Sequence, residues 1–236
     1  RMAKKNEELT RLNVELDKIV YSSSHDLMAP LRSIRGLVNL CELSDDREET
    51  KKYLSMVKER AVELEKFIKE MSDYSKNARQ SVVIEDIDIS RLIRDVLETL
   101  RFYPHAEKLS VDIDIEEDLT IMSDHTRLKV VFSNIISNCF KYFDLGKEDP
   151  FVRVSAGRIR GMVYLEISDN GMGIKESALP NIFDMFYRAT EEGEGSGLGL
   201  YIVKEAIDKL AGTIAVHSTV GVGTTFKITL PTRINS

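Results

Sequence analysis

The sequence is poor in the residues that mark several common protein classes. It holds only two cysteines, Cys41 and Cys139, which lie far apart and outside any C-x-x-C pattern. Two such thiols cannot build a zinc site by themselves, and no disulfide framework is expected, so a reducing, cytoplasmic setting is the expectation. No run of about 18 apolar residues is present, so we expect no membrane contact from this segment, whether or not a longer parent protein is membrane-attached.

An excess of basic side chains is also missing. The chain has 33 Lys and Arg against 39 Asp and Glu, which gives a formal net charge of −6. Nucleic-acid binding requires a basic footprint, so we predict no nucleic-acid partner. The first residues, Arg1 to Lys5, lead into a charged helical pattern and not into an apolar signal segment.

Glycine and proline are scarce in the first part of the chain. Only Gly36 and Pro30 lie before residue 100, although the chain has 13 glycines and 5 prolines. Acidic and basic side chains balance within residues 1–76, and the acidic excess lies beyond them. These shifts predict two domains, a helical one over 1–76 and a mixed one over 82–236, with a linker at 77–81.

The first domain has the apolar periodicity of a helical hairpin. Apolar residues at helical spacing form one seam in each half, with Leu9, Leu12, Leu16 and Ile19 in the first and Leu54, Val57, Ala61, Leu64, Ile68 and Met71 in the second. The turn between them falls at 44–47, with Asp45 or Asp46 as the N-cap. Two helices cannot bury such wide faces alone. We therefore predict a homodimeric four-helix bundle through residues 1–76, with packing onto the second domain as the alternative.

The second domain alternates predicted strands and helices. Strands are expected at 111–115, 151–157, 162–168, 213–218 and 224–230. Helices are expected from Asp124 and from about Gly199. This pattern predicts an α/β sandwich, a sheet covered on one face by helices, so the fold class of the whole chain is α + α/β.

The first motif that carries chemistry surrounds His25. Pro30 interrupts a helical pattern and kinks it one turn away from His25. An exposed imidazole can accept a phosphoryl group, because one ring nitrogen is unprotonated near neutral pH. Asp26 could accept a hydrogen bond from the other ring nitrogen. Taken alone, the pair also fits an ordinary solvent-facing histidine on a bundle.

The second motif lies on the helix predicted after Asp124. Four polar residues fall at i, i+4, i+7 and i+8, which is one helix face: Asn134, Asn138, Lys141 and Tyr142. The amide oxygen is a hard ligand suited to Mg²⁺, and the ammonium and phenol suit a triphosphate and an aromatic base. A solvated polar stripe is the alternative.

The third and fourth motifs are rich in glycine. Asp169 ends a predicted strand, where its carboxylate could accept a hydrogen bond from an exocyclic amine. Gly171 and Gly173 follow it and allow close approach of the backbone. The other motif leads directly into a helix and suits a phosphate cradle, and its residues are Gly195, Gly197, Leu198 and Gly199. An ordinary turn and a flexible linker are the respective alternatives.

Two aromatic residues and one cation lie between the two glycine motifs. Phe183 and Phe186 could anchor the base of a mobile lid, and Arg188 could reach a phosphate. Core packing is the alternative for the phenylalanine pair.

The order and spacing of these motifs resemble the catalytic core of sensor histidine kinases of two-component signalling, over nearly the whole chain. His25 matches the family's phospho-accepting histidine, within a Ser-His-Asp/Glu-Leu-x-x-Pro-Leu pattern. The matches to its nucleotide-binding boxes are Asn138, Lys141 and Tyr142; Asp169, Gly171 and Gly173; Phe183 and Phe186; and Gly195, Gly197 and Gly199. Thr224 resembles the late Thr or Ser that helps to hold adenine.

The resemblance implies an ATP-dependent protein-histidine kinase. Residues 1–76 would be the dimerisation and phosphotransfer domain. Residues 82–236 would be the ATP-binding sandwich shared with topoisomerase, chaperone and mismatch-repair ATPases. The implied cofactors are ATP and Mg²⁺, with Asn138 as the metal ligand. The implied partner is the receiver domain of a response regulator, which accepts the phosphoryl group on an Asp.

Two departures separate this chain from its relatives. The related ATPases carry a water-activating Glu one turn before the metal-binding Asn, and here Asn134 stands there and cannot act as a general base. This argues against an ATPase that works by conformational cycling. Many family members carry Thr or Asn four residues after the histidine, and here Ala29 predicts weak or absent phosphatase activity towards the partner. A nucleotide-switched dimeric adaptor without kinase activity is the alternative function.

Overall fold

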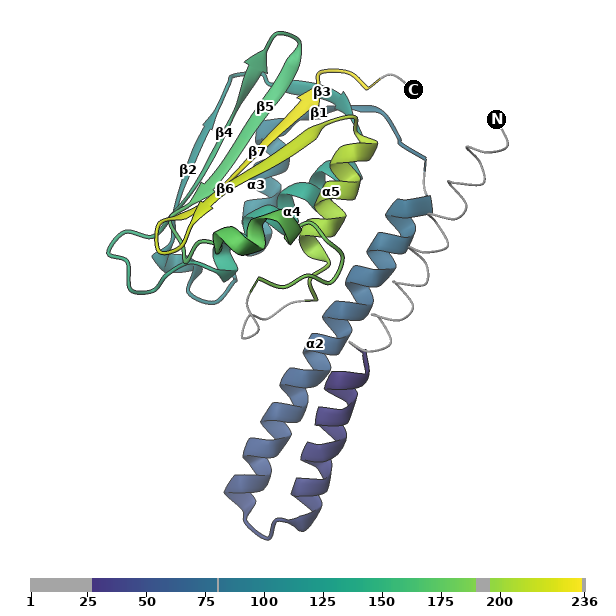
Figure 1. The fold of residues 1–236 in the computed structure, drawn as a ribbon, viewed down its shortest axis with the longest axis vertical. Coiled ribbons are helices and arrows are strands. Elements are labelled where there is room, and N and C mark those ends of the chain that lie inside the picture. The colour runs from purple at the N-terminus through teal and green to yellow at the C-terminus, as the bar shows by residue number, and fades with distance from the viewer. Residues whose placement is uncertain (1–26, 80, 190–195, 235–236) are drawn as a thin grey trace. The chain divides into compact units, whose positions relative to one another are not determined.

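The structure is a computed structural model that describes residues 27–79, 81–189 and 196–234 (Figure 1). The chain divides into a helical unit and an α/β unit, and the main boundary between them falls between Asp73 and Tyr74. Three candidate residues, His25, Asp26 and Gly195, lie outside the described residues.

The helical unit contains a helix over 27–43 and the 33-residue helix α2 (Arg47–Arg79). Asp46 caps α2, because its Oδ1 accepts the N–H groups of Glu48 at 2.8 Å and Glu49 at 3.5 Å. The predicted turn and one of its two candidate caps are therefore confirmed. Helix α2 ends at Arg79, so residues 77–79, which we expected in a linker, are helical.

The apolar seam predicted on α2 divides into two parts. Val57, Leu64 and Phe67 are at least half-buried, whereas Leu54 and Ile68 are 52% and 54% exposed. A helix that packs against one neighbour buries a single stripe, so apolar residues beside that stripe stay in contact with solvent. The hairpin carries further large exposed apolar side chains: Met28, Leu31, Val38, Leu40, Leu43, Met56 and Val62.

A mixed five-stranded sheet organises the α/β unit, with strand order β2-β4-β5-β7-β6. Its strands are β2 (Ser110–Ile115), β4 (Phe151–Ile159), β5 (Met162–Asp169), β6 (Thr213–Thr219) and β7 (Gly223–Pro231). Strands β2 and β4 are parallel, and every other neighbouring pair is antiparallel. All five predicted strands are confirmed, and burial alternates along β4, β5, β6 and β7 as in a sheet with one buried face, whereas Val111 and Ile113 of the edge strand β2 stay exposed.

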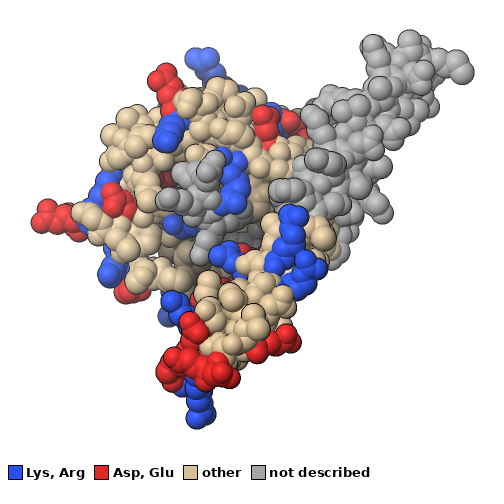
Figure 2. Space-filling view, turned by 60° about the horizontal axis from the view of Figure 1, so that its bottom comes forward, with Lys and Arg blue, Asp and Glu red and all other residues tan. Residues whose placement is uncertain are grey.

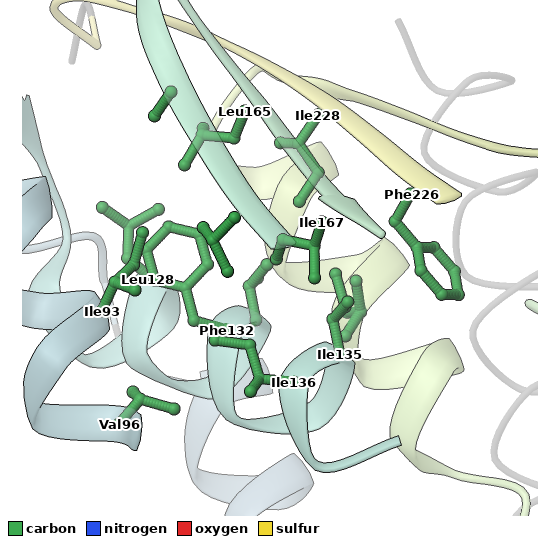
Figure 3. Close-up of a cluster of buried hydrophobic side chains, with 14 of the residues drawn as sticks. Ile93, Val96, Leu128, Phe132, Ile135, Ile136, Leu165, Ile167, Phe226 and Ile228 are labelled. Carbon is green, nitrogen blue, oxygen red and sulfur yellow. The ribbon is translucent and has the colours of Figure 1, made fainter. Parts of the chain in front are cut away.

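Three helices cover one face of this sheet: α3 (Ile89–Leu100), α4 (His125–Lys141) and α5 (Gly199–Lys209) (Figure 1). The core between the layers combines side chains from α3, α4, β5 and β7 (Figure 3). The residues labelled there are Ile93, Val96, Leu128, Phe132, Ile135, Ile136, Leu165, Ile167, Phe226 and Ile228, and all of them are buried. Burying each such side chain contributes about 1.5–3 kcal/mol. The predicted apolar face of α4 and the predicted architecture are confirmed.

Residues 81–123 contain elements that we did not predict. Strand β1 (Glu85–Asp88) pairs antiparallel with β3 (Thr120–Ser123) in a separate two-stranded sheet. Helix α3 follows β1 directly, and the Asp88 side chain caps it by accepting the N–H of Arg91 at 2.9 Å. A short 3₁₀ turn, η1 (Ala106–Lys108), also lies in this range, and a second one, η2 (Glu176–Asn181), follows β5.

The described surface carries charges of both signs. Figure 2 shows Lys and Arg interspersed with Asp and Glu on the face that it draws, which is the distribution of a mixed-charge surface. None of the helices in the described ranges combines the length and apolar character that crossing a bilayer requires.

Candidate functional site

The N-terminus of α4 is fixed by a buried ion pair. Asp124 caps the helix by accepting the N–H of Arg127 at 2.9 Å, and its other carboxylate oxygen accepts the N–H of Val83 at 3.0 Å and a hydrogen bond from the Arg127 guanidinium. The two side chains are 5% and 3% exposed. Burial alone would raise the pKa of Asp124, but these hydrogen bonds and the Arg127 charge lower it below its ordinary value. This clamp sets the position of the helix that carries the second motif.

Helix α4 carries Asn134, Asn138 and Lys141 as half-buried side chains. Asn134 donates a hydrogen bond from Nδ2 to the Val130 carbonyl at 2.8 Å, and its Oδ1 lies 2.8 Å from where a Cβ on Gly199 would stand. Asn138 is half-buried, and its side-chain amide makes no hydrogen bond to any described residue. A half-buried amide that has no hydrogen-bond partner among the described residues remains able to bind a ligand.

The last turn of α4 places a cation beside an aromatic ring. Lys141 Nζ donates a hydrogen bond to the Tyr142 hydroxyl at 2.9 Å and lies 4.6 Å from the centre of that ring. Tyr142 is 37% exposed, so part of its ring is open to solvent. The ammonium and the ring together suit an anion next to an aromatic group.

Asp169 occupies the last position of β5, above the buried thiol of Cys139. Its Oδ1 accepts the N–H of Gly171 at 2.8 Å. Burial raises the pKa of Asp169, and hydrogen bonds from Gly171, Cys139 and Thr224 with the Lys147 charge offset part of that rise. Burial, with the neighbouring Asp169 carboxylate, raises the pKa of Cys139 well above its ordinary value. The carboxylate is therefore surrounded by hydrogen-bond donors.

The loop after Asp169 is held against two other segments by close backbone approaches. A Cβ on Gly171 would lie 2.4 Å from the Tyr142 carbonyl oxygen, which also accepts the N–H of Met172 at 3.0 Å. Gly173 has φ +70°, and a Cβ there would lie 2.1 Å from the Thr219 carbonyl oxygen. Both glycines are needed because the loop passes where a side chain would collide.

The hairpin between β6 and β7 completes this corner. Gly223 has φ +141°, and a Cβ on it would lie 2.0 Å from the Asp169 carbonyl oxygen. Thr224 pairs with Asp169 in the register of β5 and β7 and is 7% exposed. Its hydroxyl lies 2.9 Å from Ser218 Oγ. Lys147 Nζ donates to the Val222 carbonyl at 3.0 Å and ties the loop after α4 to this hairpin.

The segment before α5 meets Phe186 at a tight crossing. The Phe186 N–H donates to the Gly197 carbonyl at 3.1 Å, and both residues have positive φ, 65° and 72°. Leu198 is fully buried, and Phe183 packs against the core, as the core-packing alternative predicted for it. Arg188 is exposed.

The contacts above join these candidate residues into one region of the α/β unit: Asn134, Tyr142, Asp169, Gly171, Gly173, Phe186, Gly197, Gly199 and Thr224. Backbone or side-chain contacts join the polar end of α4 to the loop after β5, to the β6–β7 hairpin and to the start of α5. Sequence reasoning missed Ser218, Cys139 and Gly223 as members of the site. Gly223 had a signal, a glycine next to Thr224, but Ser218 is one hydroxyl in an ordinary strand and had none.

Asn138 is the candidate ligand for a metal ion at this site. Among the described residues no three His, Cys, Asp or Glu side chains gather to hold one. The Asn138 amide oxygen, which accepts no hydrogen bond from a described residue, fits Mg²⁺, which commonly binds one or two protein oxygens and completes its shell with water and phosphate oxygens.

Comparisons with known proteins match both units. Residues 123–234 match the model of the histidine kinase-, DNA gyrase B- and HSP90-like ATPases, and residues 15–80 match that of the His Kinase A (phospho-acceptor) domain. Sensor histidine kinase AtsR of Burkholderia thailandensis is 29% identical over 218 residues, which cover 89% of this chain and 36% of AtsR. The chain therefore spans about a third of the length of the curated relatives that it matches.

Solved structures of histidine kinases are also similar to this chain. The mycobacterial sensor histidine kinase MprB is 28% identical with a TM-score of 0.56, over 65% of this chain and all of that one. Histidine kinase ThkA, solved with the response regulator TrrA, is 23% identical with a TM-score of 0.74, over 94% of this chain and 63% of that one, and shows the same fold.

The α/β unit is an ATPase domain of the class shared by histidine kinases, DNA gyrase B and HSP90, and it binds ATP. It follows a phospho-acceptor domain in the same chain. The chain belongs to the sensor histidine kinases and comprises their catalytic core.

Proposed function

We propose that this chain transfers the γ-phosphoryl group of ATP to His25 and then to an Asp of a separate response regulator. One observation carries the proposal: the phospho-acceptor match at 15–80 includes His25, and the ATPase match at 123–234 includes the whole described cluster around Asp169. We propose the domain limits predicted from the sequence, residues 1–76 for phosphotransfer and residues 82–236 for ATP binding.

The adenine ring binds at the corner formed by β5 and β7. Asp169 accepts a hydrogen bond from the exocyclic amine, Thr224 lies beside it, and the exposed ring face of Tyr142 contacts the base. Gly171 and Gly173 keep the loop close enough to leave room for the flat ring. The contacts of these residues with one another support a preformed base site.

The phosphates lie toward the last turns of α4 and the start of α5. Lys141 supplies a positive charge, and Arg188 is exposed and able to reach a phosphate. The segment Gly195 to Gly199 precedes α5, whose N-terminus carries a partial positive charge. Phe183 packs against the core and the Phe186 N–H donates to the Gly197 carbonyl, so both could anchor this segment, and the buried Leu198 lies at its end.

Asn138 Oδ1 would hold Mg²⁺ together with phosphate oxygens, and the ion would neutralise charge on the triphosphate. The protein supplies the acceptor. Nε2 of His25 forms a bond to the γ-phosphorus, the bond to the β,γ-bridging oxygen breaks, and ADP leaves. Asp26 accepts a hydrogen bond from Nδ1–H and holds the ring in the reactive tautomer.

Asn134 favours transfer over hydrolysis. Its amide is engaged with the Val130 carbonyl and cannot take a proton from water. His25 belongs to a different domain from the nucleotide site, so movement between the domains is part of the proposed mechanism.

Two partners are proposed for this chain, a second copy of the chain and a receiver domain. The apolar side chains exposed on the hairpin, among them Leu54 and Ile68, support a homodimer through residues 1–76. Because ThkA was solved in complex with a response regulator, we infer that a receiver domain takes the phosphoryl group from this chain too.

The test is to incubate the purified chain with Mg²⁺ and γ-labelled ATP and to measure acid-labile, alkali-stable label. We expect label in the wild type and none in His25→Gln. His217→Gln is the matched control, because His217 lies on the sheet face opposite the core and should leave labelling intact. Label that survives in His25→Gln would move the acceptor elsewhere. Bound ATP without any label would favour the nucleotide-switched adaptor.

A further inference from the structure

The end of the sheet carries a row of three polar side chains. Thr224 of β7 pairs with Asp169 of β5 on one side and with Ser218 of β6 on the other. They lie on the helix-covered face, because Val216, Phe226 and Ile167 two residues along each strand are partly or fully buried there. Asp169 and Thr224 belong to the base site proposed above, and Ser218 had no assigned role.

Ser218 Oγ makes three hydrogen bonds, which is as many as a hydroxyl can make. It accepts the N–H of Ile174 at 2.8 Å, lies 2.9 Å from the Gly223 carbonyl oxygen, and lies 2.9 Å from Thr224 Oγ1. A carbonyl oxygen can only accept, so the single Ser218 proton is directed at Gly223. If that proton pointed elsewhere, two oxygen lone pairs would face each other at 2.9 Å.

The direction of the third bond follows by elimination. Because Ser218 has no second proton, the Thr224 hydroxyl must donate its own proton to Ser218. Thr224 Oγ1 then has only lone pairs left, and it makes no other hydrogen bond to a described residue. The Thr224 backbone N–H is directed at the Asp169 carboxylate. Thr224 therefore presents an acceptor, and no donor, to the base site.

We propose that Ser218 is a positioning residue that sets base specificity by fixing Thr224 as a hydrogen-bond acceptor. This rests on the proposed ATP site and deepens it. A 6-amino purine places N–H donors against Asp169 and Thr224, whereas a 6-oxo purine places a carbonyl oxygen against the same lone pairs. Without Ser218, the Thr224 hydroxyl can rotate and donate to that carbonyl.

The experiment compares dissociation constants for ADP and IDP by calorimetry on the whole chain with Mg²⁺, since neither nucleotide can be turned over. The wild type should prefer ADP. Ser218→Ala should lower the preference for ADP over IDP about 3- to 10-fold, which corresponds to the free energy of one neutral hydrogen bond. Ser218→Thr keeps the hydroxyl and should retain the preference. If Ser218 has a purely structural role, Ser218→Ala should weaken the binding of ADP and of IDP equally and leave the ratio of their dissociation constants unchanged.

Two further variants make the result independent of how well Ser218→Ala folds. Thr224→Val removes the acceptor in a similar volume and should lower the same ratio. Thr213→Ala is the matched control, because Thr213 and Thr229 form another hydroxyl pair between β6 and β7, at the other end of these strands. It should not change the ratio.

The outcomes separate the two proposals. An unchanged ADP:IDP ratio in folded Ser218→Ala or in Thr224→Val would overturn the role of Ser218. Equal binding of ADP and IDP by the wild type would also overturn it, while the ATP site would stand. A wild type that binds neither nucleotide would overturn the proposed function itself.

Discussion

Replacing Gly173 by Ala should weaken nucleotide binding at least ten-fold, whereas the same replacement at Gly161 should leave binding unchanged. Both glycines have positive φ, +70° and +79°, so the added Cβ creates similar backbone strain at both. They differ in surroundings. A Cβ at Gly173 would lie 2.1 Å from the Thr219 carbonyl oxygen, and a Cβ at Gly161 would meet nothing within 4 Å.

The geometry sets the magnitudes. The shared strain of placing Ala in the left-handed region costs about 1–2 kcal/mol. At Gly173 the contact is roughly 1.3 Å shorter than the 3.4 Å at which ordinary contact begins, and the collision involves backbone on both sides. Forcing such an overlap costs about 1–3 kcal/mol more. Relief requires the loop and the hairpin to separate, which breaks the 2.8 Å bond from the Gly221 N–H to the Met172 carbonyl.

Urea unfolding and calorimetric titration with ADP check this pair of variants. We expect Gly161→Ala to lose about 1–2 kcal/mol of stability and to bind ADP like the wild type. Gly173→Ala should lose about 2–5 kcal/mol and bind ADP at least ten-fold more weakly. Equal stability losses with normal ADP binding in both variants would refute the argument from close approach.

Three more predictions concern the ion pair at α4 and the two departures from the family pattern. Asp124→Asn should destabilise the chain by about 3–5 kcal/mol, because it leaves the buried Arg127 charge without its partner. The pKa of Asp124 in the folded protein lies below its ordinary value. The ionised carboxylate therefore stabilises the wild type above the pKa of the unfolded state, and this stabilisation is lost as pH falls through the pKa of the folded state. Urea midpoints measured from neutral pH to about pH 3 should fall for this reason in the wild type and not in Asp124→Asn. Asn134→Glu should raise ATP hydrolysis by supplying a general base, with Asn134→Gln as control, and an unchanged rate of phosphate release would count against the prediction. Ala29→Thr should speed loss of phosphate from a phosphorylated receiver domain, and fast dephosphorylation by the wild type would show that the reasoning about Ala29 is wrong.

Local patterns were enough to predict much of the fold. The apolar face of α4 and its start at Asp124 follow from helical spacing and from a capping side chain, and both depend on residues within a few positions of one another. The strands of the large sheet follow from alternation. By contrast, β1 and β3 are four residues each and only gain stability by pairing with each other, so no local pattern marked them.

The apolar seam of α2 shows the same limit. Spacing placed Leu54 and Ile68 with Val57 and Leu64, because all of them fit a heptad pattern. Which of them are buried depends on where the neighbouring helix lies, and the structure leaves Leu54 and Ile68 exposed. The sequence therefore indicated an apolar face but not its edges.

The sequence by itself determined which chemical groups the site contains. The amide of Asn138, the carboxylate of Asp169 and the glycines after it are all visible as residue types at a fixed spacing. The tertiary structure decided how those groups are arranged, because their contacts join segments that lie far apart in the chain. Ser218 meets Ile174 across 44 positions, and no periodicity could place that hydroxyl where it directs the proton of Thr224.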